Sequence, residues 1–345
     1  MKSFEWTVVG AGPAGIAAVG KLIDGGVKPL DIAWVDPKFQ VGDLGGKWRR
    51  VSSNTKVKLF TQFLEECAVY RYQMAPDFKL KHLDPESTCL LGEIADPLQW
   101  VSDHLKVAVH PYQKEATSLS LKNRMWEVGL EDETIHSKNV ILAVGATPKK
   151  LTLPDLEEIP LEVALNDEKL ENLDLKGDTI AVFGASHSSI IVLQNLLKAH
   201  PKRVVNFYNS PLKYALYMGD WILFDNTGLK GESAVWARKY IDGAWPKELE
   251  RYPSSDPNFK KILASCNKVV YTVGFAPRTP PKTPQFMKLS SNKRNGIIAP
   301  GLFGFGIAYP EKVEDPYGNE EYNVGLWKFM TYINKVLPLW MKYAP

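Results

Sequence analysis

The chain opens with a strand-like run that ends in three closely spaced glycines. The stretch "TVVGAGPAG" places Gly10, Gly12 and Gly15 in the spacing G-x-G-x-x-G, between an apolar run and a segment of helical character. Each glycine has a physical task in such a turn. Gly10 permits the tight bend, Gly12 lets a pyrophosphate approach the backbone, and Gly15 lets the helix pack closely on the strand. This spacing predicts a dinucleotide-binding α/β unit at the N-terminus.

The residues around these glycines support the same interpretation. Pro13 and Ala14 begin the helix, whose first N–H groups and positive dipole end favour phosphate. Asp36 closes the next strand, "DIAWVD", about 20 residues after the last glycine, where a carboxylate accepts hydrogen bonds from ribose hydroxyls. Pro37 and Lys38 follow it and belong to the same candidate cofactor site. The competing interpretation is a glycine turn that binds no ligand.

A second strand, turn and helix begin at Thr179, with "TIAVF", "GASHSS" and "IIVLQNLL" in succession. Only the first glycine of the fingerprint is kept. The fingerprint positions are Gly184, Ser186 and Ser189, and the candidate loop also includes His187 and Ser188. Serine is small enough to let backbone approach phosphate, and its hydroxyl donates hydrogen bonds at a helix N-terminus. We therefore expect a modified nicotinamide-nucleotide loop.

Two other interpretations of "GASHSS" remain open. The stretch is similar to the G-x-S-x-G nucleophile elbow of hydrolases, which also lies between a strand and a helix. Ser188 in place of the last glycine would crowd that turn, and a hydrolase leaves the N-terminal fingerprint unexplained. Alternatively, the loop has lost its nucleotide, so that the first unit alone binds a cofactor.

Strand-like runs alternate with helical ones along the chain, which predicts an α/β fold with two Rossmann-like, three-layer domains. The first domain comprises residues 1–150 and 285–345, and the second comprises residues 151–284. Short runs over 115–137 predict a small antiparallel meander in the first domain, and "NVILAVGATP" predicts a separate buried strand. We expect the last helix over 324–336, and we assign no elements to 210–265.

Several further motifs follow the fingerprints in a characteristic order. They are "DLGGKWRR" at 43–50, "VSSNTKVKLFTQF" at 51–63, "ILAVGATP" at 141–148, "VVYTVGFAPR" at 269–278 and "GLFGFGIAYPE" at 301–311. This order resembles FAD enzymes of the two-dinucleotide-binding-domain superfamily, the pyridine nucleotide-disulfide oxidoreductases and flavin-containing monooxygenases. The resemblance covers nearly the whole chain. It adds cofactor-binding candidates at Gly45, Gly46, Lys47, Trp48, Ala143, Gly145, Gly274, Gly306 and Ile307.

The resemblance implies an FAD-dependent oxidoreductase that is reduced by NADPH or NADH and acts on a small-molecule substrate or electron acceptor. It places Asn54 beside the flavin as the candidate catalytic residue. The strand "RVVNFYN" ends without an acidic residue, and Lys213 follows, which favours NADPH. The resemblance implies a monooxygenase-like enzyme, but the histidine signature F-x-G-x-x-x-H-x-x-x-F/Y of the monooxygenases is missing, which argues against oxygen insertion and not against FAD binding. The alternative from another class is an FAD-binding sensor or interaction module with a degenerate nicotinamide site.

Composition limits the partners, metals and cellular location that we expect for this protein. The formal net charge of +3, from 42 basic and 39 acidic residues, gives no reason to expect nucleic acid or an anionic membrane as partner. The three cysteines, Cys67, Cys89 and Cys266, form no C-x-x-C pair, and the six histidines show no metal-ligand spacing, so we expect no metal. No apolar window reaches about 18 residues, so we expect no membrane insertion. These features together predict a cytoplasmic protein.

Overall fold

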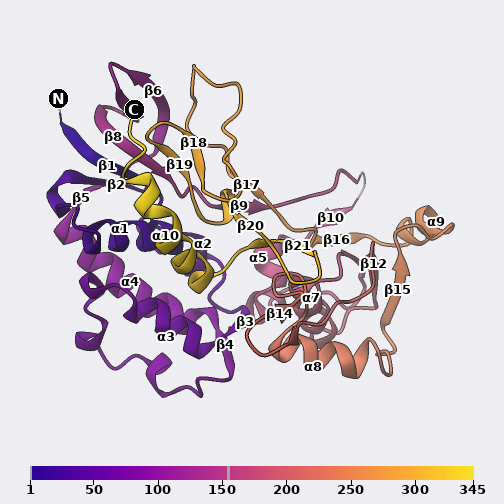
Figure 1. Cartoon of the computed structure of the whole chain (residues 1–345). Coiled ribbons are helices and arrows are strands. Elements are labelled where there is room, and N and C mark those ends of the chain that lie inside the picture. Colours follow the sequence, from indigo (N-terminus) through magenta and orange to yellow (C-terminus); the bar gives the residue numbers. More distant parts are fainter. Residues whose placement is uncertain (1, 154–155) are drawn as a thin grey trace.

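Two sheets with parallel strands at their centres organise the chain in the computed structural model, which describes residues 2–153 and 156–345 (Figure 1). The first sheet has the order β18-β19-β8-β1-β2-β5, with β7 and β6 attached to β8. Its strands are β1 (Ser3–Val9), β2 (Ile32–Val35), β5 (His110–Tyr112), β6 (Ala116–Lys122), β7 (Met125–Leu130), β8 (Thr134–Leu142), β18 (Ile297–Ala299) and β19 (Leu302–Gly304). Strands from both ends of the chain therefore share one sheet.

Strand β8 combines two features that the sequence analysis treated as separate. Its first residues pair antiparallel with β7, which completes the β6-β7-β8 meander. Its later residues pair parallel with β1 and with β19. The predicted meander and the predicted buried strand within a parallel sheet are both confirmed, but they share the single strand β8 instead of using two strands. The polar positions Ser137 and Asn139 do not interrupt β8, because both are buried and Ser137 Oγ donates to the carbonyl of Asn139 at 2.7 Å.

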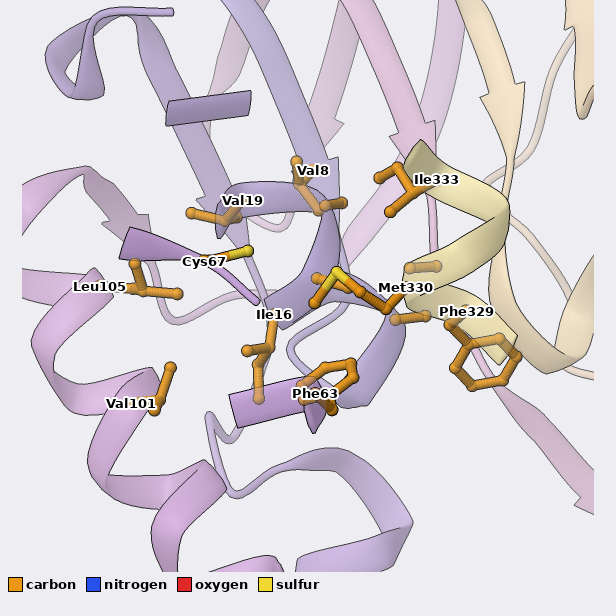
Figure 2. Close-up of a cluster of buried hydrophobic side chains, with 14 of the residues drawn as sticks. Val8, Ile16, Val19, Phe63, Cys67, Val101, Leu105, Phe329, Met330 and Ile333 are labelled. Carbon is orange, nitrogen blue, oxygen red and sulfur yellow. The ribbon is translucent and has the colours of Figure 1, made fainter. Parts of the chain in front are cut away.

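Helices cover one face of the first sheet and the meander lies over the other. The helices are α1 (Pro13–Asp24), α2 (Gly42–Gly46), α3 (Val57–Glu65), α4 (Leu91–Ala108) and α10 (Leu326–Trp340). Side chains from β1, α1, α3, α4 and α10 meet in one apolar core, where Figure 2 labels Val8, Ile16, Val19, Phe63, Cys67, Val101, Leu105, Phe329, Met330 and Ile333. The neighbouring Val9 points to the opposite core, with Trp126 and Val128 of the meander. Burial on both faces explains why the central strands are apolar throughout.

The second sheet is wholly parallel and has the order β10-β16-β11-β12-β15. Its strands are β10 (Glu157–Glu158), β11 (Thr179–Phe183), β12 (Arg203–Tyr208), β15 (Leu249–Pro253) and β16 (Lys268–Tyr271), with helices α5 (Leu161–Ala164), α6 (Asp167–Glu171), α7 (His187–Lys198), α8 (Gly231–Tyr240) and α9 (Phe259–Leu263). Ile180 and Val182 face the core under α5, α7 and α8. Ala181 and Phe183 face the aromatic core beside α9. The sheet is therefore the middle of three layers, and the predicted fold class is confirmed.

Four two-stranded ribbons and short 3-10 turns complete the described part of the chain. The ribbons are β3 (Ser52–Lys56) with β4 (Thr88–Leu90), β9 (Ala146–Pro148) with β17 (Phe275–Pro277), β13 (Leu216–Tyr217) with β14 (Ile222–Leu223), and β20 (Glu311–Glu314) with β21 (Glu320–Asn323). The 3-10 turns are η1 (Pro29–Asp31), η2 (Ala68–Tyr70), η3 (Tyr72–Met74), η4 (Lys79–His82) and η5 (Gly306–Ala308). The β9–β17 ribbon joins the segments by which the chain passes between the two sheets.

The last helix differs from its predicted range of 324–336. It starts after Gly325, whose φ of 147° is not helical, and continues to Trp340. Pro338 does not end the helix, because Leu337 and Trp340 remain buried beyond the predicted end. Among the described residues, no helix is both long enough and apolar enough to cross a membrane.

Candidate functional site

The first glycine loop is held in place by close backbone contacts. Gly10 has φ +111°, and a Cβ there would lie 2.3 Å from the carbonyl oxygen of Ala143, at the end of β8. A Cβ on Gly15 would lie 1.8 Å from the carbonyl oxygen of Gly10. Trp34 Nε1 donates to the same oxygen at 2.9 Å. The protein itself therefore requires glycine at positions 10 and 15, where α1 packs on the turn.

Gly12 is different, because the protein does not require glycine there. Its φ and ψ of −76° and −177° are open to any residue, and a Cβ would meet only the Cα of Gly42, at 3.9 Å. Gly12 is the N-cap of α1, ahead of Pro13 and the buried Ala14. The first N–H groups of a helix have no partner within the helix. Open space beside these donors fits a bound pyrophosphate.

Asp36 shapes the turn that borders this loop. Its Oδ2 accepts from the backbone N–H of Ala11 at 2.8 Å, and its Oδ1 accepts from those of Lys38 and Phe39 at 2.8 and 2.7 Å. Pro37 and Lys38 are exposed. Each carboxylate oxygen has more than one acceptor site, so Asp36 can also accept from ribose hydroxyls. Its predicted role toward the ribose remains a prediction.

The structure brings the late glycine motif to the start of α1. A Cβ on Gly306, which has φ +76°, would lie 2.6 Å from the Cβ of Ala14, and Ile307 packs against the core of the first sheet. Gly45 and Gly46 lie in the short α2, where a Cβ on Gly45 would lie 2.2 Å from the carbonyl oxygen of Gln40. The loop of Gly306 and the short helix α2 therefore lie beside the N-terminus of α1, next to the first glycine loop.

The residues after α2 lead toward the second sheet. Lys47 lies between Asp43 and Glu162, at 3.9 and 3.6 Å. The Trp48 ring meets Phe275 edge-on, with ring centroids 6.2 Å apart. We find Lys47 and Trp48 at the boundary between the two sheets.

The two crossover segments, which contain Ala143, Gly145 and Gly274, run side by side. Lys149 N donates to the carbonyl of Gly274 at 2.9 Å, and Arg278 N donates to the carbonyl of Gly145 at 3.0 Å. Gly145 and Gly274 both have positive φ, +77° and +88°. A Cβ on Gly274 would meet no atom within 4 Å, so this glycine borders open space.

The second loop repeats the geometry of the first with different residues. Gly184 has φ +129°, and a Cβ there would lie 2.3 Å from Thr272 Oγ1, at the end of β16. Ser186 is the N-cap of α7 and is exposed, as Gly12 is the N-cap of α1. The buried Ser189 donates its hydroxyl to the carbonyl of Gly184 at 2.8 Å. The serine that replaces the third glycine is therefore accommodated by a hydrogen bond.

This geometry excludes the nucleophile elbow. The φ of Ser186 is −98°, which is ordinary extended backbone, whereas an elbow holds its serine on a strained turn. The neighbouring His187 is engaged at both ring nitrogens by Ser52 and Ser233. It is not available as a base for Ser186.

A cleft of about 210 Å³ joins the second loop to the candidate catalytic residue. It is lined by Asn54, Leu161, Ser186, His187, Ser188, Asn226, Thr227, Gly228, Thr272, Gly274 and Phe275. Asn54 comes from β3, and its Oδ1 accepts from Thr55 Oγ1 at 3.2 Å. Residues far apart in the sequence thus share one cleft at the border of the two sheets.

One wall of the cleft comes from the segment to which the sequence analysis assigned no elements. Glu321 of β21 accepts from the backbone N–H groups of Asn226 and Thr227, at 3.0 and 3.1 Å. Lys328 Nζ donates to Asn226 Oδ1 at 2.7 Å. The local sequence around Asn226 could not predict this part of the cleft, because the residues that hold Asn226 and Thr227 in place belong to β21 and α10.

His187 connects three elements at the bottom of this loop. The ring is partly buried, and this burial lowers the pKa of His187 below its usual value, although the hydrogen bond to Ser52 acts in the opposite direction. Nε2 lies 3.0 Å from the carbonyl oxygen of Ser52, which can only accept, so Nε2 carries the proton. In the neutral ring, Nδ1 accepts from the Ser233 hydroxyl at 3.0 Å.

Lys213 does not lie free beside the second loop. It is exposed, and its ammonium lies 4.7 Å from the centre of the Phe224 ring. A different cation is closer to the fingerprint: Arg251 Nε donates to Asn206 Oδ1 at 2.9 Å, and Asn206 Nδ2 donates to the carbonyl of Gly184 at 2.8 Å. The guanidinium of Arg251 also stacks over Tyr208 at 4.7 Å, and burial lowers its pKa. The sequence analysis missed Arg251 because it lies on β15.

Metal ligands do not cluster in the described part of the chain, where no group of three or more His, Cys, Asp or Glu could hold an ion. The three cysteines are free.

Known proteins place this fold in a family. Residues 4–206 match the model of the pyridine nucleotide-disulphide oxidoreductases. The chain is 34% identical to Monooxygenase AgnR1 of Paecilomyces divaricatus, over 97% of each chain. Its fold is similar to a flavin monooxygenase from Stenotrophomonas maltophilia, with TM-score 0.65, 12% identity and 99% of each chain covered. A bacillithiol disulfide reductase from Staphylococcus aureus has TM-score 0.63 and 11% identity, over 98% of this chain and 99% of its own. The chain belongs to the pyridine nucleotide-disulphide oxidoreductase family and is an FAD-dependent oxidoreductase, as the resemblance of its motifs predicted.

Proposed function

We propose that the protein is a flavin monooxygenase that is reduced by NADPH and acts on a small molecule. The observation that carries the proposal is the shared cleft, in which Asn54 and the second nucleotide loop line the same space. A flavin takes a hydride from a nicotinamide and passes the electrons to oxygen or to another acceptor. The residues of this chain would bind the two cofactors, orient them and limit the access of water.

The shape of the first glycine loop supports FAD binding. Gly12 leaves open space in front of the N-terminus of α1, and Asp36 lies at the end of the adjacent strand. Gly306 and Ile307 approach the same helix terminus. We propose that these residues hold the pyrophosphate and the sugar portions of FAD.

The second loop supports nicotinamide binding in the same way. Gly184 turns the chain, Ser186 caps α7, and the exposed serine hydroxyl adds a donor for phosphate. Arg251 beside Asn206 supports NADPH over NADH, since a guanidinium binds a phosphate through paired hydrogen bonds. Lys213 remains a second candidate for the same phosphate.

Monooxygenation is supported by the relative that carries this name, at 34% identity over nearly the full chain. Electron transfer to a neighbouring dithiol, the other chemistry in the family name, finds no support in three free cysteines without a C-x-x-C pair. The missing histidine signature makes a reductase without oxygen insertion the second candidate, and the following experiment separates the two.

The test is an anaerobic absorbance titration of the purified protein with NADPH and then NADH, followed by air. We expect a yellow protein whose flavin bands bleach faster with NADPH. After admission of air, the oxygen consumed and the hydrogen peroxide released are compared with each of a panel of candidate small molecules present. Oxygen uptake in excess of peroxide with any of them identifies the monooxygenase, and equal amounts with all of them favour a reductase. A yellow protein that neither nucleotide bleaches would point to the non-catalytic sensor, for which family membership gives no support.

A further inference from the structure

The segment that carries Asn54 contacts both halves of the molecule: β3 pairs with β4, whereas Lys47 and Arg50 ahead of it reach α5 and α6 of the second sheet. Lys47 pairs with Glu162, and Arg50 Nη2 donates to Asp167 at 3.0 and 3.2 Å. These ion pairs are partly or fully exposed, and exposed ion pairs contribute little to stability. They do not by themselves determine where Asn54 lies.

Two contacts of the same segment with the second sheet are more buried: Val51 lies in the apolar core there, and the carbonyl of Ser52 accepts a hydrogen bond from His187. His187 is the first residue of α7, and its ring donates a hydrogen bond to Ser52, the first residue of β3. The other ring nitrogen accepts a hydrogen bond from Ser233 of the adjacent α8. Ser233 is 1% exposed, and Ser52 Oγ also lies 3.3 Å from Glu232 Oε2 of α8. Ser52 and Asn54 are two residues apart on one strand and share a face. The hydrogen bond of His187 therefore acts on Asn54 through Ser52, in addition to the pairing of β3 with β4.

We infer that His187 is a positioning residue that keeps Asn54 at one separation from the second nucleotide loop. This inference rests on the proposed function, in which the cleft receives the nicotinamide. Because Nε2 must donate and Nδ1 must accept, the ring has one tautomer and one orientation. A rigid, uncharged link of this kind suits hydride transfer, whose rate depends steeply on the separation of the reacting groups.

The experiment compares His187→Ala, His187→Gln and Ser233→Ala with wild type, all loaded with FAD. We expect His187→Ala to lower the limiting rate of flavin bleaching by NADPH by up to about 100-fold, with unchanged FAD content. His187→Gln should retain most of the rate, because its amide group can both donate and accept a hydrogen bond. His82→Ala is the matched control, since His82 is exposed and pairs with Asp77 away from the cleft.

Amide hydrogen exchange gives a second readout that does not require turnover. We expect faster exchange over residues 52–56 in His187→Ala and Ser233→Ala, and no change in His82→Ala. If His187→Ala does not fold, Ser233→Ala carries the test, because the ring stays and only one of its hydrogen bonds is lost.

Two results overturn the inference while leaving the proposed function intact. One is a wild-type rate of bleaching in His187→Ala and Ser233→Ala, whether or not exchange is faster, because the link is then merely structural. The other is a lower rate with unchanged exchange over residues 52–56, because His187 then does not act through the strand that carries Asn54. A wild-type protein that neither nucleotide bleaches contradicts the proposed function itself, and the positioning role with it.

Discussion

Gly12 and Gly15 differ in whether the protein itself leaves room for a side chain. At Gly15 the obstacle is the carbonyl of Gly10, whereas at Gly12 the protein leaves open space. We propose that glycine at position 12 serves a ligand that approaches the backbone. A substitution can therefore separate folding from FAD binding.

We predict that Gly12→Ser leaves the free energy of unfolding of the apoprotein unchanged, because serine is a good N-cap and its Cβ meets no close atom. FAD affinity should fall about 10- to 100-fold, as hydrogen bonds to the phosphates are lost. Urea unfolding and a fluorescence titration with FAD measure the two effects. Gly15→Ala is the contrasting variant and should destabilise the protein by about 1–3 kcal/mol. Equal FAD affinity in Gly12→Ser and wild type would contradict the FAD site.

Ser186 allows the same separation in the second loop. We predict that Ser186→Asp preserves folding, because aspartate caps a helix as well as serine does. The new charge should repel a phosphate and weaken NADPH binding about tenfold or more. Isothermal titration of the oxidised protein with NADP+ measures the change. Ser186→Asn, a neutral cap of similar size, is the control. Unaltered NADP+ affinity in Ser186→Asp would mean that the pyrophosphate does not bind at this loop.

Arg251 and Lys213 are competing candidates for recognition of the 2′-phosphate. We predict that Arg251→Met raises the dissociation constant for NADPH about 10- to 100-fold, since a charge-assisted hydrogen bond is lost, and leaves that for NADH unchanged. Lys213→Met should change neither, because its ammonium is exposed over Phe224. Steady-state kinetics with both nucleotides measure the difference. The reverse result would assign the phosphate to Lys213.

The glycine positions of the candidate site could be predicted from sequence because each belongs to a turn of a few residues. Gly10 and Gly184 both have the positive φ that such a turn demands. Arg251 could not be predicted, since only the parallel pairing of β12 and β15 places it opposite Asn206. The two hydrogen bonds of His187 likewise join segments that are distant in sequence.

At the scale of single elements, α10 links the end of the chain to the first sheet. Trp340 is fully buried, stacks on Phe303 with ring centroids 4.8 Å apart, and donates its Nε1 proton to the carbonyl of Asn295 at 2.6 Å. The apolar stripe of this helix was visible in the sequence. Its true end was not, because burial of Trp340 extends the helix beyond Pro338.

We predict that Trp340→Ala lowers the free energy of unfolding by about 3–5 kcal/mol, through lost burial and an unfilled cavity. Leu339→Ala is the control, because Leu339 is 43% exposed and should change stability by no more than about 0.5 kcal/mol. Urea unfolding followed by tryptophan fluorescence and circular dichroism measures both. A loss below about 1 kcal/mol in Trp340→Ala would show that α10 is not an integral part of the core.

For the whole molecule, the central question is whether the two sheets belong to separately folding domains. The first sheet takes β18 and β19 from the end of the chain, and α10 packs in its core. The second sheet takes its strands from residues 157–271. The ribbon of β9 and β17 connects them, close to the predicted boundaries at 150 and 285.

We predict that residues 1–150 joined to 285–345 by a flexible Gly/Ser linker fold and bind FAD, and that residues 1–150 alone do not. The shorter piece lacks β19, the parallel neighbour of β8, and leaves the apolar face of α1 without α10. Circular dichroism, cooperativity of unfolding and recovered FAD measure the outcome. The control is residues 151–284, which should fold without FAD. FAD binding by residues 1–150 alone would contradict the discontinuous domain.

The sequence alone determined the α/β class, the two fingerprints and the order of motifs that leads to FAD. These depend on local backbone sterics and on the periodicity of apolar residues, which operate over a few residues. Only the tertiary structure decided that β8 serves both the meander and the parallel sheet, that Arg251 and Asn226 lie near the second loop, and that His187 contacts Ser52 and Ser233. Such contacts arise because packing brings distant segments together, and no local pattern records which segments will meet.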